Sequence, residues 1–274
     1  MQGSIIQTLS LAIHGNAFLR GYTGTPFFPG NSTCQFCKDI SFILLQPGMG
    51  QPSEVPFANA PDEWFANQAR RGARRHRVWW ASGGDPKMPD RMLVGFVGGG
   101  GHWRIDTLLA DASESWEGYW RVGDQKDPER RIWNVTYVRG SWRPTAPFVQ
   151  KLTLGAHVEK LEKLLPEASA FARRQSLTSF AEFFERGLDC LHAPNPLAKV
   201  FHKDVAPQGF LPVDAERLLA ATQAAWVFGA MGSWNDLGFT SFKSLEREEY
   251  EQLSERLYHA LNEAAIDAAN SLPG

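Results

Sequence analysis

The sequence predicts an α+β protein with a helical C-terminal half and an N-terminal half rich in antiparallel strands. Short runs of strand-forming residues, separated by turns containing Gly or Pro, recur up to residue 142. Beyond residue 150, apolar residues recur every three to four positions, as on a helix with one buried face. We expect an antiparallel β-rich region over 1–142 (a sandwich, barrel or curled meander) and a helical region over 150–274. The sequence leaves open whether these are two domains or one fused core.

The first elements are expected to be extended. Residues 4–46 predict two or three strands, because apolar residues alternate in part of the run from Ile5 to Ile13 and turn residues follow it. After a loop over 47–58, a short helix is expected near 61–75. Pro61 suits its first position, and the arginines at its far end favour the helix dipole.

The next stretch predicts five strands, with a domain boundary after them. Their expected ranges are 77–82, 91–97, 102–108, 117–122 and 131–139. Four successive glycines, 98–101, are expected to form a flexible hairpin loop, with a mobile flap beside a ligand site as the alternative. A pair of prolines in 143–147 marks the boundary.

Four helices are expected after this boundary. The first carries the spaced apolar residues of 154–165, and the second begins at Ser179, where Glu182 completes a capping box. Asp214 is expected to cap the third helix. The last helix is the clearest, because Leu253, Leu257 and Leu261 lie on one face opposite charged residues.

Composition excludes several classes of protein. The net charge is −2, so we do not expect a nucleic-acid partner. Three cysteines in 274 residues argue against a disulfide framework and favour a cytoplasmic location. No apolar run reaches the ~18 residues that a membrane span needs, so no membrane association is expected.

The ten Trp and eighteen Phe residues are the unusual feature of the composition. Seven of the tryptophans fall between Trp79 and Trp142. Large rings usually lie in the core, so a compact core built on them is the first interpretation. The alternative is an aromatic-lined groove for a sugar, a base or a peptide.

Neither a metal nor a cofactor is expected. Cys34 and Cys37 form a C-x-x-C pair, but a closed zinc site needs four ligands. Cys190 and His192 could complete the set, and the sequence leaves open whether these four residues meet. On a strand, the paired cysteines would face opposite sides of the sheet.

Two groups of polar residues are candidates for binding or chemistry. His102 and Asp106 have the even spacing that places both on one face of a strand, where they could exchange protons. A solvent-facing side of an antiparallel strand explains the same residues. Arg74 and Arg75 are expected to lie exposed at a helix end, and the alternative is that they bind an anion, an acidic partner or a nucleic-acid backbone.

A third candidate is the corner formed by Trp234, Asn235 and Asp236, which follows glycines 229 and 232. The glycines allow a sharp turn or a close approach of two backbones. The large ring and the two polar side chains could then border a ligand pocket or lock the helical half onto the sheet.

No catalytic motif is present in the sequence, so the first hypothesis is a non-catalytic binding or interaction protein, an accessory subunit of a bacterial system. Its expected partner is another protein or a small ligand. The alternative is an enzyme whose site is assembled from distant segments, with His102, Asp106, Asn235 and Asp236 as the residues.

Overall fold

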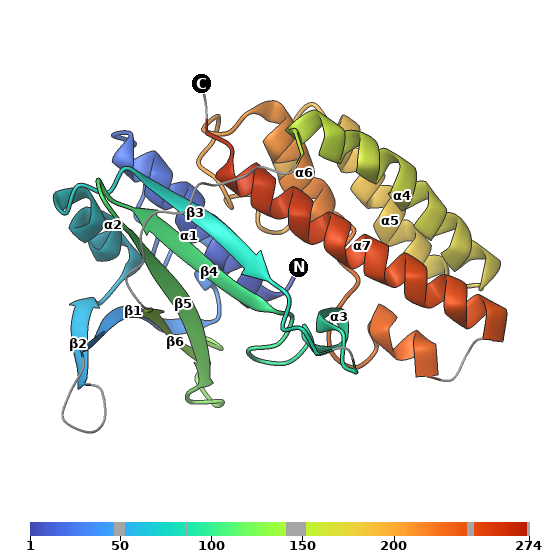
Figure 1. Cartoon of the computed structure of the whole chain (residues 1–274), viewed down its shortest axis with the longest axis horizontal. Helices are drawn as coiled ribbons and strands as arrows, with labels where there is room; N and C mark the ends of the chain where they lie inside the picture. Colours follow the sequence, from blue (N-terminus) through green and yellow to red (C-terminus); the bar gives the residue numbers. More distant parts are fainter. Residues whose placement is uncertain (47–52, 86, 141–151, 240–243, 273–274) are drawn as a thin grey trace.

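A single mixed β-sheet and a set of long helices make up the fold, with the first helix packed between them (Figure 1). The computed structural model describes residues 1–46, 53–85, 87–140, 152–239 and 244–272. The strands are β1 (Cys37–Gln46), β2 (Ser53–Ala58), β3 (Arg75–Ala81), β4 (His102–Leu108), β5 (Ser113–Val122) and β6 (Trp133–Arg139). The α+β class is therefore confirmed.

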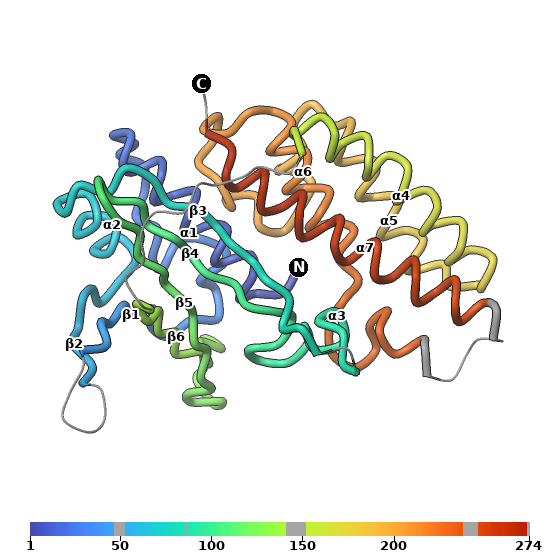
Figure 2. The backbone as a smooth tube through the Cα atoms, viewed as in Figure 1, coloured from blue at the N-terminus to red at the C-terminus, as the bar shows by residue number. Residues whose placement is uncertain are grey.

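The helices divide between the two halves of the chain. The N-terminal half contains α1 (Gly3–Leu19), α2 (Pro61–Arg70) and the short α3 (Asp90–Leu93). The C-terminal half contains α4 (Leu154–Arg174), α5 (Thr178–His192), α6 (Val213–Ala224) and α7 (Ser244–Asn270). Three 3₁₀ turns are η1 (Ser32–Cys34), η2 (Leu197–Lys199) and η3 (Trp234–Phe239). In the tube view, α7 runs alongside α4 for much of its length (Figure 2).

The sheet is open and has the strand order β2-β1-β6-β5-β4-β3. Strands β3 to β6 form an antiparallel meander, but β1 pairs with β6 in parallel. The sheet is thus mixed rather than wholly antiparallel, and it is neither a sandwich nor a barrel. The parallel pair is possible because a long connection, which contains β2 to β5, joins β1 to β6.

The largest error of the sequence prediction concerns the first twenty residues. Residues 4–46 were expected to hold two or three strands, but Gly3–Leu19 is a helix, and β1 is the one strand in that range. Every residue from 5 to 13 is buried, because α1 contacts the sheet on one side and α7 on another. A helix buried all round has no polar stripe to reveal its period.

Three further expectations for the N-terminal half are corrected. Part of the loop expected over 47–58 is the strand β2, Ser53–Ala58. The strand expected over 91–97 is absent: α3 and a turn occupy this range, and a side chain at Gly95 would collide with the backbone of Gly229. Cys34 ends η1 and Cys37 begins β1, and both are buried, so they do not face opposite sides of one strand. The boundary expected at 143–147 lies outside the described residues.

The helices of the C-terminal half follow the prediction except at their starts. α5 begins at Thr178 with no side-chain cap, and Pro212 rather than Asp214 precedes α6. Pro212 fixes a backbone geometry that can start a helix without a side-chain cap. Leu253, Leu257 and Leu261 of α7 are buried, as expected. The core joins both halves of the chain in one hydrophobic cluster.

The aromatic residues mostly build this core, as the first interpretation held. Trp64 and Trp116 are fully buried, and Phe42 stacks on Trp64 with ring centroids 4.9 Å apart. Tyr137 stacks on the other side of Phe42 at 5.1 Å. Pairs of this kind stabilise a core beyond their buried area.

Two asparagine side chains form hydrogen bonds with the backbone of β3 at its free edge. The amide of Asn270, at the end of α7, accepts the Val78 N–H at 2.8 Å and donates to the Val78 carbonyl at 2.9 Å. Asn16 of α1 makes the same pair of bonds to His76, at 2.7 and 2.8 Å. Gly15 lets α1 come this close, because a methyl group there would lie 2.6 Å from the His76 ring. The two amides therefore replace a neighbouring strand.

We expect Asn270→Ala to lower the free energy of unfolding by about 2–5 kcal/mol, because it leaves the N–H and carbonyl of Val78 buried without partners. Urea denaturation monitored by far-UV circular dichroism measures the loss. The exposed Asn195 supplies the control, since Asn195→Ala should change stability by less than about 0.5 kcal/mol. Equal effects of the two substitutions would contradict the strand-like role of Asn270.

Stability should also depend on pH through His76. Burial lowers the pKa of His76 to about 3, whereas an unfolded histidine titrates near pH 6.5. The unfolded chain then binds a proton that the folded chain excludes, so stability falls as pH drops below about 6.5. The slope from this one group is at most about 1.4 kcal/mol per pH unit. We expect His76→Phe to reduce the change in the free energy of unfolding between pH 6.5 and 5, as measured by urea denaturation. Changing the exposed His192 to Gln should not reduce it.

Candidate functional site

The corner around Trp234 is a packed junction between η3 and the helices. Trp234 is buried, its indole N–H donates to the Ser254 hydroxyl at 2.8 Å, and the Phe180 and Phe184 rings contact it. The buried Asn235 amide donates to the Arg91 carbonyl at 2.6 Å. Asp236 is exposed, and its carboxylate accepts the Gly232 N–H. A role of this corner in binding stays a prediction.

His102 and Asp106 share the outer face of β4, as their spacing predicted. They do not contact each other, and each is paired with other residues. His102 lies 3.6 Å from Glu117, and its side chain is 68% exposed. Asp106 accepts from Arg104 at 2.9 Å and from the Ser115 hydroxyl at 2.7 Å. Asn235 and Asp236 do not line the cavity beside His102 that the structure describes.

The arginine-rich segment separates into different environments. Arg74 is exposed, as expected, but Arg75 is half-buried and donates to the backbone carbonyl of Asn270. Burial lowers the pKa of Arg75. The Arg71 guanidinium donates two hydrogen bonds, of 2.5 and 2.7 Å, to the buried Glu114 carboxylate. The segment therefore caps α7 and neutralises a buried carboxylate, so exposure was the wrong expectation for Arg75.

The cysteines lie in the core. Cys34, Cys37 and Cys190 are buried free thiols, and burial raises the pKa of Cys37 to about 11. His192 is exposed on α5, where it lies 3.5 Å from Glu162. Within the described ranges, no group of three or more His, Cys, Asp or Glu side chains is arranged to hold a metal ion.

A cavity of about 410 Å³ opens where β4 begins and β5 passes the first turns of α1. The glycine run 98–101 forms one wall. Its loop follows α3 rather than closing a hairpin, which corrects the sequence expectation. His102, Trp103, Glu117, Tyr119, Trp120 and Arg121 line much of the rest. We call this space the glycine-loop cavity.

Sterics explain why this loop contains four glycines. Gly98, Gly100 and Gly101 have φ angles of 79°, 89° and 86°, which residues with a side chain rarely adopt. Gly99 has an ordinary φ, but a methyl group there would lie 2.0 Å from the Leu93 carbonyl oxygen. Each of the four positions therefore excludes a side chain, for one of two separate reasons.

Hydrogen bonds also tie the loop to other elements, while its flexibility stays a prediction. The Gly100 carbonyl accepts three hydrogen bonds from aromatic side chains. The donors are the indole N–H groups of Trp80 (3.0 Å) and Trp103 (3.3 Å) and the Tyr258 hydroxyl (2.9 Å). These residues come from β3, β4 and α7, so the tertiary structure sets the shape of the cavity wall.

The cavity combines apolar rings with hydrogen-bonding groups. Tyr119 is 48% exposed, and its hydroxyl donates to the Glu117 carboxylate at 3.2 Å. The Trp120 ring packs edge-on against Trp133 at 5.8 Å. A flat ligand could lie against the Tyr119 ring while its polar groups bond to Glu117, His102 or Arg121.

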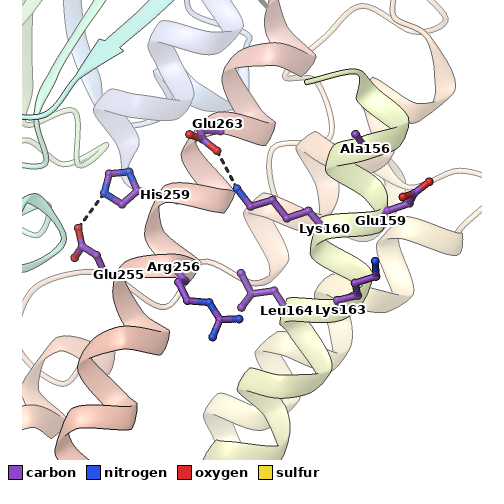
Figure 3. Close-up of a pocket in the computed structure, with 9 residues that line it drawn as sticks. All are labelled: Ala156, Glu159, Lys160, Lys163, Leu164, Glu255, Arg256, His259 and Glu263. Atoms are coloured by element: carbon purple, nitrogen blue, oxygen red, sulfur yellow. Dashed lines mark hydrogen bonds and ion pairs between the residues drawn. The ribbon is translucent and has the colours of Figure 1, made fainter. Parts of the chain in front are cut away.

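A second cavity, of about 600 Å³, lies in the groove between α4 and α7 (Figure 3). Its charges are mostly paired within the protein. Lys160 binds Glu263 at 3.0 Å, Arg256 binds Glu167 at 2.6 Å, and His259 binds Glu255 at 2.9 Å. Such pairing leaves little unsatisfied charge for a ligand, so we place the candidate site at the glycine-loop cavity.

The comparisons with known proteins leave function to the geometry. A scan of protein-family models, a search of curated proteins and a search of solved structures found no match to this chain. Across the described part of the chain, each helix falls short of the length or the apolar character that a bilayer span requires.

Sequence reasoning found part of this site. It singled out His102 and the glycine run, but not Glu117, Tyr119 or Arg121. Their alternation along β5 carried a signal, because three polar or amphipathic residues at even spacing mark one strand face. The contact between this end of the sheet and α1 could not be foreseen once α1 was interpreted as strands.

Gly99→Ala should destabilise the protein by about 1–3 kcal/mol, the usual range for forcing extra volume into a packed site. The loop must move away from Leu93, so tryptophan fluorescence from Trp80 and Trp103 should change as well. Gly155→Ala is the matched control, since nothing lies within 4 Å of a methyl group at that position. If both variants keep wild-type stability and fluorescence, the loop is not sterically constrained.

Proposed function

We propose that this chain is a non-catalytic binding protein and that the glycine-loop cavity holds its ligand. The ligand class we infer is a small molecule with a flat face and several polar groups, such as a sugar ring or a nucleobase. The observation that carries the proposal is a hydrogen-bonded loop that lines one cavity with a partly exposed tyrosine ring and three hydrogen-bonding side chains.

A preformed wall supports binding, because a site that is already ordered loses little entropy when its ligand arrives. Three aromatic donors hold the Gly100 carbonyl, so the wall formed by 98–101 is already shaped in the folded chain. The absence of side chains at three of these positions lets the loop pack closely against Leu93, Val94 and Trp80, so the wall is compact.

The chemistry of the lining supports the ligand class. Tyr119 offers a ring on the face of β5 that also carries Glu117 and Arg121, and Glu117, His102 and Arg121 offer an acceptor and donors at the same cavity. On the same loop, Phe96 is 64% exposed, and Val97 lies at the cavity itself. Exposed apolar side chains beside a polar pocket are typical of a binding surface.

The wider role expected from the sequence stays part of this proposal. An accessory subunit in the cytoplasm of a bacterium would bind a small ligand or another protein without changing it. This role rests on the sequence alone.

Binding can be tested with four named probes: glucose, N-acetylglucosamine, adenosine and uridine. Saturation-transfer NMR and the quenching of tryptophan fluorescence should detect at least one of them with a Kd at or below about 1 mM. Tyr119→Ala and Glu117→Gln should each weaken that binding about tenfold or more, which corresponds to about 1.4 kcal/mol. Both positions are at least partly exposed, so the fold should survive.

Lys163→Gln is the control, because Lys163 lies in the α4–α7 groove and is exposed. It should leave the affinity unchanged. If none of the four probes binds, or if binding is the same in all three variants, the proposed site or ligand class is wrong.

Catalysis at the same cavity is the second candidate function. It is favoured by the 3.6 Å separation of His102 Nδ1 and Glu117 Oε1, which would let the two groups act as an acid–base pair. An NMR time course distinguishes the two functions. A binding protein returns each probe unchanged, whereas an enzyme converts a bound probe and loses that conversion in His102→Gln.

A further inference from the structure

A third cavity, of about 540 Å³, lies between α5, the turn η2 and the end of α6. It is separate from the glycine-loop cavity, and the two share no lining residue among those described. Two aromatic rings and two cations border it: Phe183 and Arg186 from α5, and Lys199 and Phe201 from the segment around η2. Its volume lies in the range of small-molecule pockets.

The segment that carries Lys199 and Phe201 is firmly anchored. The His202 N–H donates to the Gln223 side chain at 3.2 Å, and the His202 ring bonds to the Ser32 hydroxyl at 2.9 Å. Asp204 accepts the Ser32 N–H at 2.8 Å. These bonds tie the segment to α6 on one side and to η1 on the other.

Phe201 nevertheless remains 66% exposed on this anchored segment. Folding gains little from a ring left in water. Phe183 is partly exposed on the opposite wall, at 37%. Two exposed rings that border one cavity form an apolar surface suited to a ligand.

The cations at this cavity differ from those in the α4–α7 groove. Lys160 of that groove binds Glu263 (Figure 3), and Arg256 binds Glu167. For Arg186 and Lys199, the described residues supply no acidic group within ion-pair distance, although Asp189 also borders the cavity. Arg186 instead lies over the Phe183 ring, with its guanidinium carbon 4.4 Å from the ring centroid.

The remaining polar groups add no compensating charge near pH 7. Burial lowers the pKa of His202 to about 4, so its ring is neutral. Burial raises the pKa of the Cys190 thiol, which therefore stays protonated. With two cations and one carboxylate, the lining carries a net positive charge.

We infer that this cavity binds a small amphipathic anion. Its ring or alkyl group would lie between Phe183 and Phe201, and its carboxylate or phosphate would bond to Arg186 and Lys199. Charge-assisted bonds to two cations are strong and directional, and the rings supply the apolar contact. This site is independent of the one proposed for the neutral polar ligand.

The test uses three probes of similar apolar size: 4-phenylbutyrate, 4-phenylbutyl phosphate and the uncharged 4-phenylbutanol. Calorimetric titration should show binding of at least one charged probe and binding of the alcohol at least about tenfold weaker, a difference of about 1.4 kcal/mol. Comparing carboxylate with phosphate identifies the preferred head group. Added salt should weaken binding of the charged probe, because exposed charges are screened.

Variants then locate the site. Arg186→Gln and Lys199→Gln should each weaken binding of the charged probe about tenfold, and Phe201→Ala should weaken binding of all three probes. All three side chains are exposed, so the melting temperature should stay at the wild-type value. Lys163→Gln, which removes a cation from the α4–α7 groove, should leave every affinity unchanged.

Three results would overturn the inference: no binding of either charged probe, equal binding of the alcohol, or wild-type affinity in both cation variants. If Tyr119→Ala removed the binding while Arg186→Gln did not, the anion would belong to the glycine-loop cavity. If an acidic protein bound through Arg186 and Phe201 while both small charged probes failed, the surface would be a protein interface instead.

Discussion

The pairing of the β3 edge by two asparagine side chains is the constraint on which the arrangement of the molecule depends. An edge strand presents unpaired N–H and carbonyl groups, and burying them without partners costs roughly 1–3 kcal/mol for each group. Asn16 and Asn270 satisfy those of His76 and Val78. Because these asparagines belong to the first and last helices, one strand holds both ends of the described fold together.

The candidate site depends on this junction. With α7 fixed along β3, Tyr258 reaches the Gly100 carbonyl beside the indole groups of Trp80 and Trp103. The loop therefore takes its shape from contacts between elements that are far apart in the sequence. A change at the β3 edge should therefore alter the position of the glycine loop, because α7 contacts both the edge and the loop.

The three cavities differ in how their charged side chains are paired. Between α4 and α7, oppositely charged pairs recur every seven residues along both helices: Lys160–Glu263, Glu167–Arg256 and Arg174–Glu249. Exposed pairs of this kind add little stability one by one, but they leave that groove nearly neutral. The glycine-loop cavity offers mixed polar groups and a partly exposed tyrosine ring, and at the cavity beside Phe201 the described residues place no acidic group within ion-pair distance of Arg186 or Lys199. The last two cavities therefore suit different ligands.

The sequence by itself determined the elements whose pattern is local. The period of α7, the alternation along β4 and the proline that opens α2 were all read correctly from the chain. It also placed His102 and Asp106 on one face and pointed to the glycine run. Only the tertiary structure decided that Gly3–Leu19 is a helix, because a segment buried on every side carries no amphipathic period. It also decided the partners of Arg75 and Asn270 and the hydrogen bond between Tyr258 and the glycine loop. Hydrogen bonds between distant segments produce no regular pattern in the sequence.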